Sequence, residues 1–196
     1  MIYNEKMDFL KSFLFWQPKK DWLNWMEQTL FRKKCVIFLN YIIWFFLFYI
    51  SYLLIKKDTG IFWQILIATL VAEVFERFLK SKIYWRRPFF NRKDKTPLGL
   101  VDRWYKTGSF PSGHTIKTTY FLLFIIQYSV FPIPIFLLIV IPLLFFRVII
   151  GFHYPVDMFG GFITGCLVWG LSKWIVFPIF LTEIIKIIFN FVFFIK

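Results

Sequence analysis

Residues 111–131 read PSGHTIKTTYFLLFIIQYSVF, a short polar opening followed by a run dominated by apolar residues. A transmembrane helix needs about 20 such residues to cross a hydrocarbon core of about 30 Å. The run therefore predicts a membrane-spanning helix over Ser112–Phe131. The polar residues at its start then lie at one membrane face, where the free N–H groups of a helix N-terminus attract an anion.

Five more apolar runs flank this one. Together they predict an all-α, polytopic membrane helix bundle with about six transmembrane helices. Charged residues inside the second and sixth runs are spaced three or four apart, so they can pair along one helix face. The five runs are Cys35–Ile55, Ile61 to about Lys80, Ile133–Ile150 with Pro142 as an expected kink, Asp157–Phe177 and Ile179–Ile195.

The amino-acid composition indicates that the chain is embedded in a lipid bilayer. Its 196 residues are 59% hydrophobic and 24% aromatic, against about 45–50% apolar residues in soluble domains. The net charge of +13 comes from basic residues that flank apolar runs, so anionic lipid headgroups are better partners than nucleic acid. Cys35 and Cys166 lie in apolar segments and are expected as buried thiols. No cleavable signal peptide is expected.

The first 34 residues follow a different pattern. Apolar and aromatic residues recur there near helical spacing, with lysines and acidic residues between them. This pattern is typical of helices that lie in the membrane interface. We therefore divide the chain into an interfacial amphipathic segment, residues 1–34, and a transmembrane domain, residues 35–196. The long polar connection Ser81–Phe110 is expected to be functional.

Two polar clusters stand at the ends of adjacent predicted helices. Lys80 and Arg87 are seven residues apart, which is about two helical turns, so both can point to one side and bind phosphate. In the second cluster, Pro111 suits a first helical position. There Gly113 lets a phosphate approach the backbone, Ser112 adds a hydroxyl donor, and His114 lies one turn in, near a leaving oxygen.

The third cluster runs from Arg147 to Asp157 and contains the second of only two histidines in the chain. Gly151 and Pro155 break the helix between Arg147 and His153. Asp157 can then hold one ring nitrogen of His153 and leave the other as a nucleophile. Counting membrane crossings puts all three clusters on the same face, so one site can be assembled from them.

The motifs Lys-x6-Arg-Pro, Pro-Ser-Gly-His and Arg-x5-His-x3-Asp, in this order, resemble those of the type 2 phosphatidic acid phosphatase superfamily. The resemblance covers Lys80–Asp157, with compatible helices on both sides. It implies a lipid phosphatase that needs no metal and no cofactor. One departure is Phe146, where the family often has a small residue before the third-motif arginine.

The resemblance also implies a role for each motif residue. His153 attacks phosphorus and forms a phosphohistidine, Asp157 orients His153, and His114 protonates the leaving alkoxide and then assists water. The residues that bind phosphate oxygens are Lys80, Arg87, Ser112, Gly113 and Arg147. No obligatory protein partner is evident. Lys82 and Arg86 are equally compatible with headgroup contacts and with solvated charges. Lys117, one turn after His114, is equally compatible with lining the pocket and with snorkelling to the membrane surface. Tyr84, Trp85 and Trp104 favour an aromatic belt.

Other functions remain open at this point. A phosphotransferase that passes the phosphate to another lipid fits the same motifs. A channel or transporter does not explain why Lys, Arg, Ser, His and Asp converge on one face, and the haloperoxidase relatives are soluble and larger. Extra basic residues between Lys80 and Lys106 suit a polyanionic headgroup, such as that of lipid A, phosphatidylglycerophosphate or undecaprenyl diphosphate. All three are lipids of the bacterial cell envelope.

Membrane orientation is ambiguous. The face with the three clusters carries seven Lys and Arg from residues 1–34, nine from Lys80–Lys106, and Lys196, whereas the other face carries only Lys56, Lys57 and Lys173. The positive-inside rule would place the clusters in the cytoplasm. The resemblance implies the opposite, namely a bacterial inner membrane protein with a periplasmic site. We follow the resemblance, because cations that bind substrate distort the count.

Overall fold

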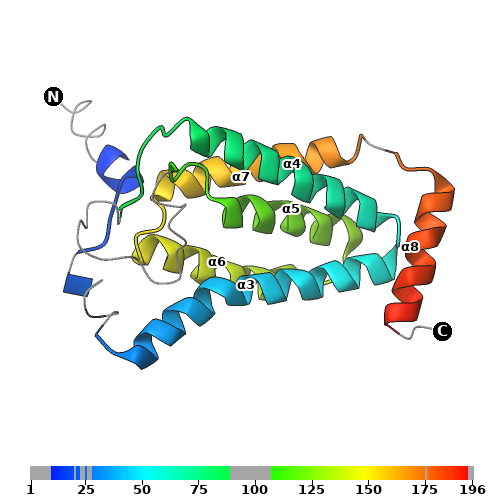
Figure 1. Ribbon diagram of the computed structural model, residues 1–196, viewed down its shortest axis with the longest axis horizontal. Helices are drawn as coiled ribbons and strands as arrows, with labels where there is room; N and C mark the ends of the chain where they lie inside the picture. The colour runs from blue at the N-terminus through cyan, green and yellow to red at the C-terminus, as the bar shows by residue number, and fades with distance from the viewer. Residues whose placement is uncertain are drawn as a thin grey trace.

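The computed structural model describes residues 10–19, 21–22, 25, 28–88, 107–174 and 176–193. Within these ranges the chain has long helices and no strand, which confirms the predicted all-α fold. Figure 1 labels the helices used below. They are α3 (Leu30–Lys57), α4 (Ile61–Ser81), α5 (Gly113–Tyr128), α6 (Ile133–Ile149), α7 (Pro155–Ser172) and α8 (Ile179–Val192).

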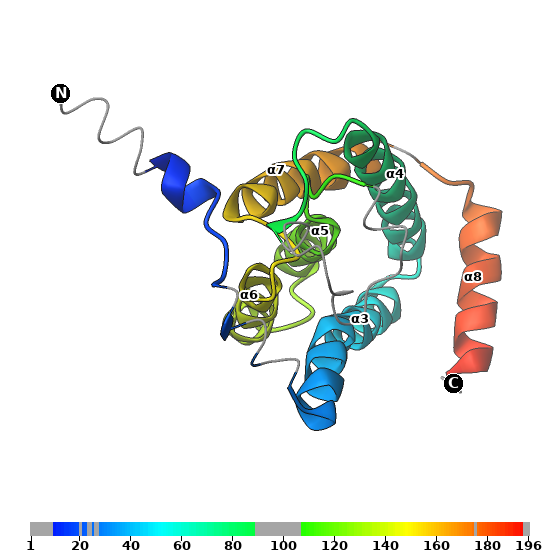
Figure 2. The ribbon, with the colours of Figure 1, turned by 60° about the vertical axis from the view of Figure 1, so that its left-hand side comes forward.

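The helices α3 to α7 run back and forth along a common direction, and α5 lies at the centre of the bundle (Figure 2). Short connections join α3 to α4, α5 to α6 and α6 to α7, and a long one joins α4 to α5. The end of α4, the start of α5, the end of α6 and the start of α7 all meet at one end of the bundle (Figure 1). The three polar clusters lie there. The fold therefore places all three clusters on one face, as the sequence predicted.

Helices α5 and α7 approach each other more closely than ordinary side chains allow. A Cβ atom on Gly161 would lie 2.8 Å from the Ser112 carbonyl oxygen, and one on Gly165 would lie 2.7 Å from the Ile116 carbonyl oxygen and 2.6 Å from Thr119 Cβ. Two glycines spaced four apart form the small-residue stripe by which membrane helices bring their backbones into contact. The sequence thus supplies a groove on α7 into which α5 packs.

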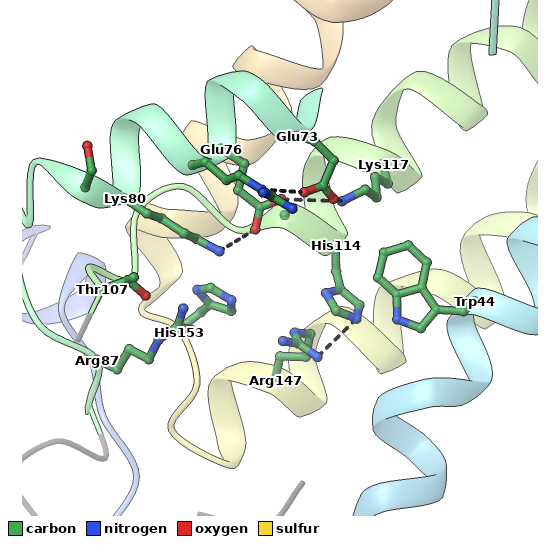
Figure 3. Close-up of a pocket in the computed structure, with 13 residues that line it drawn as sticks. Trp44, Glu73, Glu76, Lys80, Arg87, Thr107, His114, Lys117, Arg147 and His153 are labelled. Carbon is green, nitrogen blue, oxygen red and sulfur yellow. Dashed lines mark hydrogen bonds and ion pairs between the residues drawn. The ribbon is translucent and has the colours of Figure 1, made fainter. Parts of the chain in front are cut away.

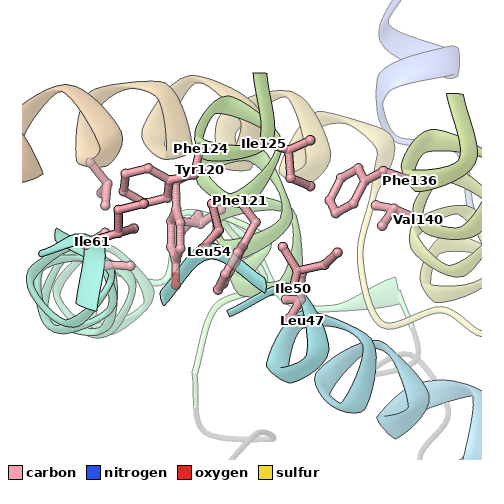
Figure 4. Packing of buried hydrophobic residues seen from close by; sticks show 14 residues of the cluster. Leu47, Ile50, Leu54, Ile61, Tyr120, Phe121, Phe124, Ile125, Phe136 and Val140 are labelled. Carbon is pink, nitrogen blue, oxygen red and sulfur yellow. The ribbon is translucent and has the colours of Figure 1, made fainter. Parts of the chain in front are cut away.

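The hydrophobic core surrounds the middle of α5 (Figure 4). Ile116, Phe124 and Ile125 are fully buried there, and Tyr120 is almost so. Helices α3, α4 and α6 cover them with buried residues that include Leu47, Ile50, Leu54, Ile61, Phe136 and Val140. Central burial of α5 explains how a helix only 16 residues long is fixed in place.

The outer faces of the bundle are apolar. Phe45 on α3 is 74% exposed, Leu138 on α6 is 75% exposed, and exposed Val74 and Leu167 extend the surface over α4 and α7. Exposed apolar area of this extent fits contact with lipid. Among the described residues, α3 with its 28 residues is long and apolar enough to cross a membrane by length and composition, and α6 is apolar but shorter.

Helix α8 differs from the sixth predicted transmembrane helix. It has 14 residues, which makes it shorter than each of the helices α3 to α7. Figure 1 shows it crossing the far end of the bundle rather than running along it. It contacts α3 through stacking of Phe189 on Tyr52 at 5.7 Å. Glu183 and Lys186 form the predicted pair, at 3.7 Å.

Much of the predicted interfacial segment, residues 1–9 among it, lies outside the described residues. The described part contains a short helix over residues 10–14 at the end that holds the clusters (Figure 1). Just after it, Phe15 packs edge-on against Trp85 at 5.2 Å and Tyr154 at 5.4 Å. Helix α3 begins at Leu30, with Thr29 as its N-cap, so it extends into the predicted segment.

The contact between α5 and α7 predicts that added volume on Gly165 destabilises the protein. Gly165→Ala should lower the free energy of unfolding by about 1–3 kcal/mol, because overpacking forces the two backbones apart. Gly170→Ala is the matched control, since a Cβ there meets nothing within 4 Å, and it should be neutral or stabilise by up to about 1 kcal/mol. Thermal unfolding in detergent micelles measures both, and equal midpoints for the two variants would contradict the close packing.

Candidate active site

The three clusters line one pocket of about 470 Å³ at the shared end of the bundle (Figure 3). Of the predicted site residues, Lys80, Arg87, Gly113, His114, Arg147 and His153 line it, and Asp157 lies behind His153. The remaining lining residues are Trp44, Glu73, Glu76, Arg77, Ser81, Thr107 and Lys117. The pocket therefore combines two histidines with several cations and two carboxylates.

His153 lies in the turn between α6 and α7. Gly151 has a φ of 76°, a conformation that favours glycine, and Pro155 is the first residue of α7. The predicted break between Arg147 and His153 is therefore present. His153 Nδ1 lies 3.3 Å from Asp157 Oδ2, which also accepts from the Tyr154 N–H at 2.8 Å. With Nδ1 turned to the carboxylate, Nε2 is the ring nitrogen left for the pocket.

The charge state of His153 follows from its surroundings. Burial lowers the pKa of His153 well below its ordinary value, and the nearby cations Arg87, Arg147 and Lys80 lower it further. Both causes favour the neutral imidazole. A neutral ring held by a carboxylate on one side has a lone pair on the other, which is the form a nucleophile requires.

The cations of the pocket are anchored by groups from several elements. Arg87 donates to the Phe152 carbonyl at 3.1 Å, and burial lowers its pKa to about 10, so it stays protonated near neutral pH. Arg147 pairs with Asn40 of α3 and contacts His114 Nε2 at 3.2 Å. Arg147 Nε is buried and has no hydrogen-bond partner within the described part of the chain. Such a donor fits an anionic ligand.

A chain of opposite charges borders the pocket on the α4 side (Figure 3). Lys80 pairs with Glu76 and Arg77 with Glu73, as predicted from their spacing. Lys117 of α5 joins both carboxylates, at 2.7 Å from Glu73 and 3.4 Å from Glu76. The sequence left open whether Lys117 lines the pocket or snorkels, and the structure places it in the pocket lining. Its position one turn after His114 indicated that it could reach the pocket. Its pairing with Glu73 and Glu76 could not be predicted, because these partners are more than 40 positions away in the sequence.

The second cluster differs from its prediction in two respects. Helix α5 begins at Gly113 with Ser112 as its N-cap, so Pro111 precedes the helix instead of occupying its first position. Ser112 does not line the pocket: its fully buried Oγ accepts from Thr115 Oγ1 at 3.0 Å. In this structure Ser112 caps α5, and its phosphate contact stays a prediction. Gly113 does line the pocket, and a Cβ there would overlap the Glu76 carboxylate.

Several residues outside the motifs also reach the site. Asn40 of α3 accepts a hydrogen bond from Arg147. Trp44 of the same helix packs against the His114 ring, with the ring centroids 4.6 Å apart. Trp85, predicted as part of an aromatic belt, instead donates from Nε1 to Asp157 Oδ1 at 2.9 Å. Phe146 is half-buried and does not line the pocket. Trp104 and the basic residues 92–106 lie outside the described residues.

The arrangement suits a tetrahedral oxyanion better than a metal ion. Three cations surround the space in front of His153, and cation clusters of this kind bind phosphate. Among the described residues, no group of three or more His, Cys, Asp or Glu side chains could hold a metal ion. Metal independence itself stays a prediction.

Comparison with known proteins gives two findings. A family model described as the PAP2 superfamily matches residues 61–190, from α4 into α8, and so includes all three clusters. Among solved structures, the chain is similar to a transmembrane PAP2 type phosphatidylglycerolphosphate phosphatase from Bacillus subtilis. The TM-score is 0.51 with 21% sequence identity, over 76% of this chain and 78% of that one. At this identity the likeness shows a shared fold.

The pocket geometry predicts that inorganic phosphate binds and stabilises the folded protein. Lys80→Met and Arg147→Gln should each weaken phosphate binding by about tenfold or more, because a hydrogen bond to a charged group contributes about 1.5–3 kcal/mol. Lys82→Met is the control, since Lys82 follows α4 directly but is exposed and does not line the pocket. Titrating the thermal midpoint with phosphate measures the affinity, and equal affinity in all three variants would contradict the assignment.

Proposed function

Because this chain belongs to the PAP2 superfamily, we propose that it is an integral-membrane lipid phosphatase that works through a phosphohistidine on His153. One observation carries the proposal: His153 is held by Asp157 at 3.3 Å and opens onto the pocket that Lys80, Arg87 and Arg147 line. A nucleophile, its orienting group and the charge needed to stabilise phosphoryl transfer are thus close together.

In the first step, the three cations bind the non-bridging phosphate oxygens and His153 Nε2 attacks phosphorus. A nitrogen–phosphorus bond forms as the bond from phosphorus to the lipid oxygen breaks. Asp157 stabilises the positive charge that develops on the imidazole ring. Because the cations are already arranged around the pocket, they stabilise the transferring group without reorganising.

His114 is the proposed acid for the leaving oxygen. A guanidinium only donates, so the contact at 3.2 Å makes His114 Nε2 an acceptor from Arg147 in the substrate-free site. Phosphate binding engages Arg147 and brings negative charge into the pocket, so Nε2 is free to take up a proton from solvent, which it then gives to the leaving alkoxide. In the second step the same nitrogen takes a proton from water as the water oxygen attacks the phosphohistidine. Lipid alcohol and inorganic phosphate are released, and the enzyme is restored.

The shape of the bundle supports a substrate that arrives from the bilayer. Helices α3 and α4 meet at the far end and diverge toward the site end (Figure 1), and the pocket is lined from both, by Trp44 on one side and Glu73, Glu76 and Lys80 on the other. A lipid can therefore present its phosphate to His153 while its hydrocarbon chains stay in the membrane. We propose an envelope lipid phosphomonoester or diphosphate: lipid A, phosphatidylglycerophosphate or undecaprenyl diphosphate.

Phosphate release from a panel of these lipids in detergent tests the proposal. His153→Ala should reduce kcat by at least about a thousandfold, as removal of a covalent nucleophile does in other enzymes. The folded state of the variant is checked by its thermal midpoint. Activity that survives His153→Ala would refute the mechanism, and activity that requires a second lipid as phosphate acceptor would identify a phosphotransferase. A chelator should leave turnover unchanged.

Membrane orientation has its own prediction. We propose that the site faces the periplasm of a bacterial inner membrane, which requires the connection between α3 and α4, residues 58–60, to lie in the cytoplasm. A reporter that is active only in the periplasm should be silent when inserted at residues 58–60 and active when fused before residue 1. The opposite pattern, which the positive-inside rule favours, would overturn the proposed orientation.

A further inference from the structure

We propose that Trp85 is a positioning residue for the nucleophile, because its indole N–H holds the carboxylate that orients His153. The inference rests on the proposed function, since it assigns Trp85 a part in the same reaction. Trp85 is one of the unspecified residues between Lys80 and Arg87, so the motif itself does not distinguish it. The assignment comes from where the fold places its ring.

The two oxygens of Asp157 have separate partners. Oδ2 faces His153 Nδ1 at 3.3 Å and accepts from the Tyr154 N–H at 2.8 Å. Oδ1 accepts from Trp85 Nε1 at 2.9 Å. Asp157 is fully buried, so bulk water does not replace the indole as a donor. Trp85 therefore fixes the rotation of the carboxylate about its last side-chain bond, and with it the direction of Oδ2.

Trp85 is itself held from several sides. Its carbonyl oxygen accepts from the Ser109 N–H at 3.2 Å, and its ring packs edge-on against Phe15 and Phe110, each at 5.2 Å. These contacts come from the segment before α3 and the segment before α5. An indole clamped in this way directs its N–H in one direction, which a freely rotating side chain would not do.

The consequence for catalysis is geometric. In-line attack requires His153 Nε2 to point at phosphorus, and a misplacement of about 1 Å can cost a rate factor of about 100. Without the N–H of Trp85, the Asp157 carboxylate keeps the Tyr154 N–H and the nearby Ser109 hydroxyl. It loses its indole donor and can rotate, which lets the imidazole ring tilt. Because Trp85 does not line the pocket, the change should slow chemistry without weakening the binding of substrate.

Two replacements separate the N–H from the ring. Trp85→Phe keeps an aromatic ring and removes the donor, and replacing Trp85 with benzothienylalanine keeps the bicyclic shape and exchanges N–H for sulfur. We expect kcat to fall about tenfold in both, which is about 1.4 kcal/mol of transition-state stabilisation, with KM unchanged. Trp63→Phe is the matched control. Trp63 is stacked on Phe177 at the far end of the bundle, and its Nε1 has no hydrogen-bond partner among the described residues.

The outcomes distinguish the inference from the proposed function. If benzothienylalanine at position 85 retains the full kcat, Trp85 acts only through packing and the inference is overturned. A rise in KM with constant kcat would also overturn it, because Trp85 would then contribute to binding. If His153→Ala remains active in the same assay, the proposed function itself fails. Supporting data are a loss of kcat in both Trp85 variants, full activity in Trp63→Phe and no activity in His153→Ala.

Discussion

The contact between the backbones of α5 and α7 positions the rest of the site. Gly161 and Gly165 remove the side chains that would separate the two helices, since a Cβ on either would lie within 3 Å of α5 or its N-cap residue. At the end of this contact, the Ser112 N–H donates to the Asp157 carbonyl at 3.0 Å. The start of the helix that carries His114 is therefore tied to the start of the helix that carries Asp157. The relative position of the two histidines follows from packing between helices rather than from a flexible loop.

A second constraint is electrostatic. Arg87 and Arg147 are buried and Lys80 is half-buried, and all three line one pocket. Burial of like charges is unfavourable unless other groups compensate. Glu76, which pairs with Lys80 and Lys117, provides negative charge at the edge of the pocket. Asn40 and the Phe152 carbonyl accept from the two arginines. The cations are thus held in position at a tolerable cost, which is the preorganisation that phosphoryl transfer needs.

Much of the fold could be predicted because hydropathy is a local property. Each of the six apolar runs became a helix, and short connections make α3 and α4, α5 and α6, and α6 and α7 antiparallel. That α8 spans the membrane stays a prediction. Hydropathy shows that its residues avoid water, but not whether they run through a bilayer or across its surface. The direction of α8 depends on its contact with Tyr52 of α3, over 130 positions away.

The sequence by itself determined the chemistry of the candidate site: two histidines, three cations and one aspartate at helix ends that topology brings to the same face. The sequence determines this because the spacing of the motifs and the number of membrane crossings between them depend only on the order of residues. Only the tertiary structure decided which partner each polar group has. Ser112 caps α5, Lys117 joins Glu73 and Glu76, and Trp85 donates to Asp157 from 72 positions away. These hydrogen bonds join elements distant in sequence, so their geometry exists only once the helices have packed.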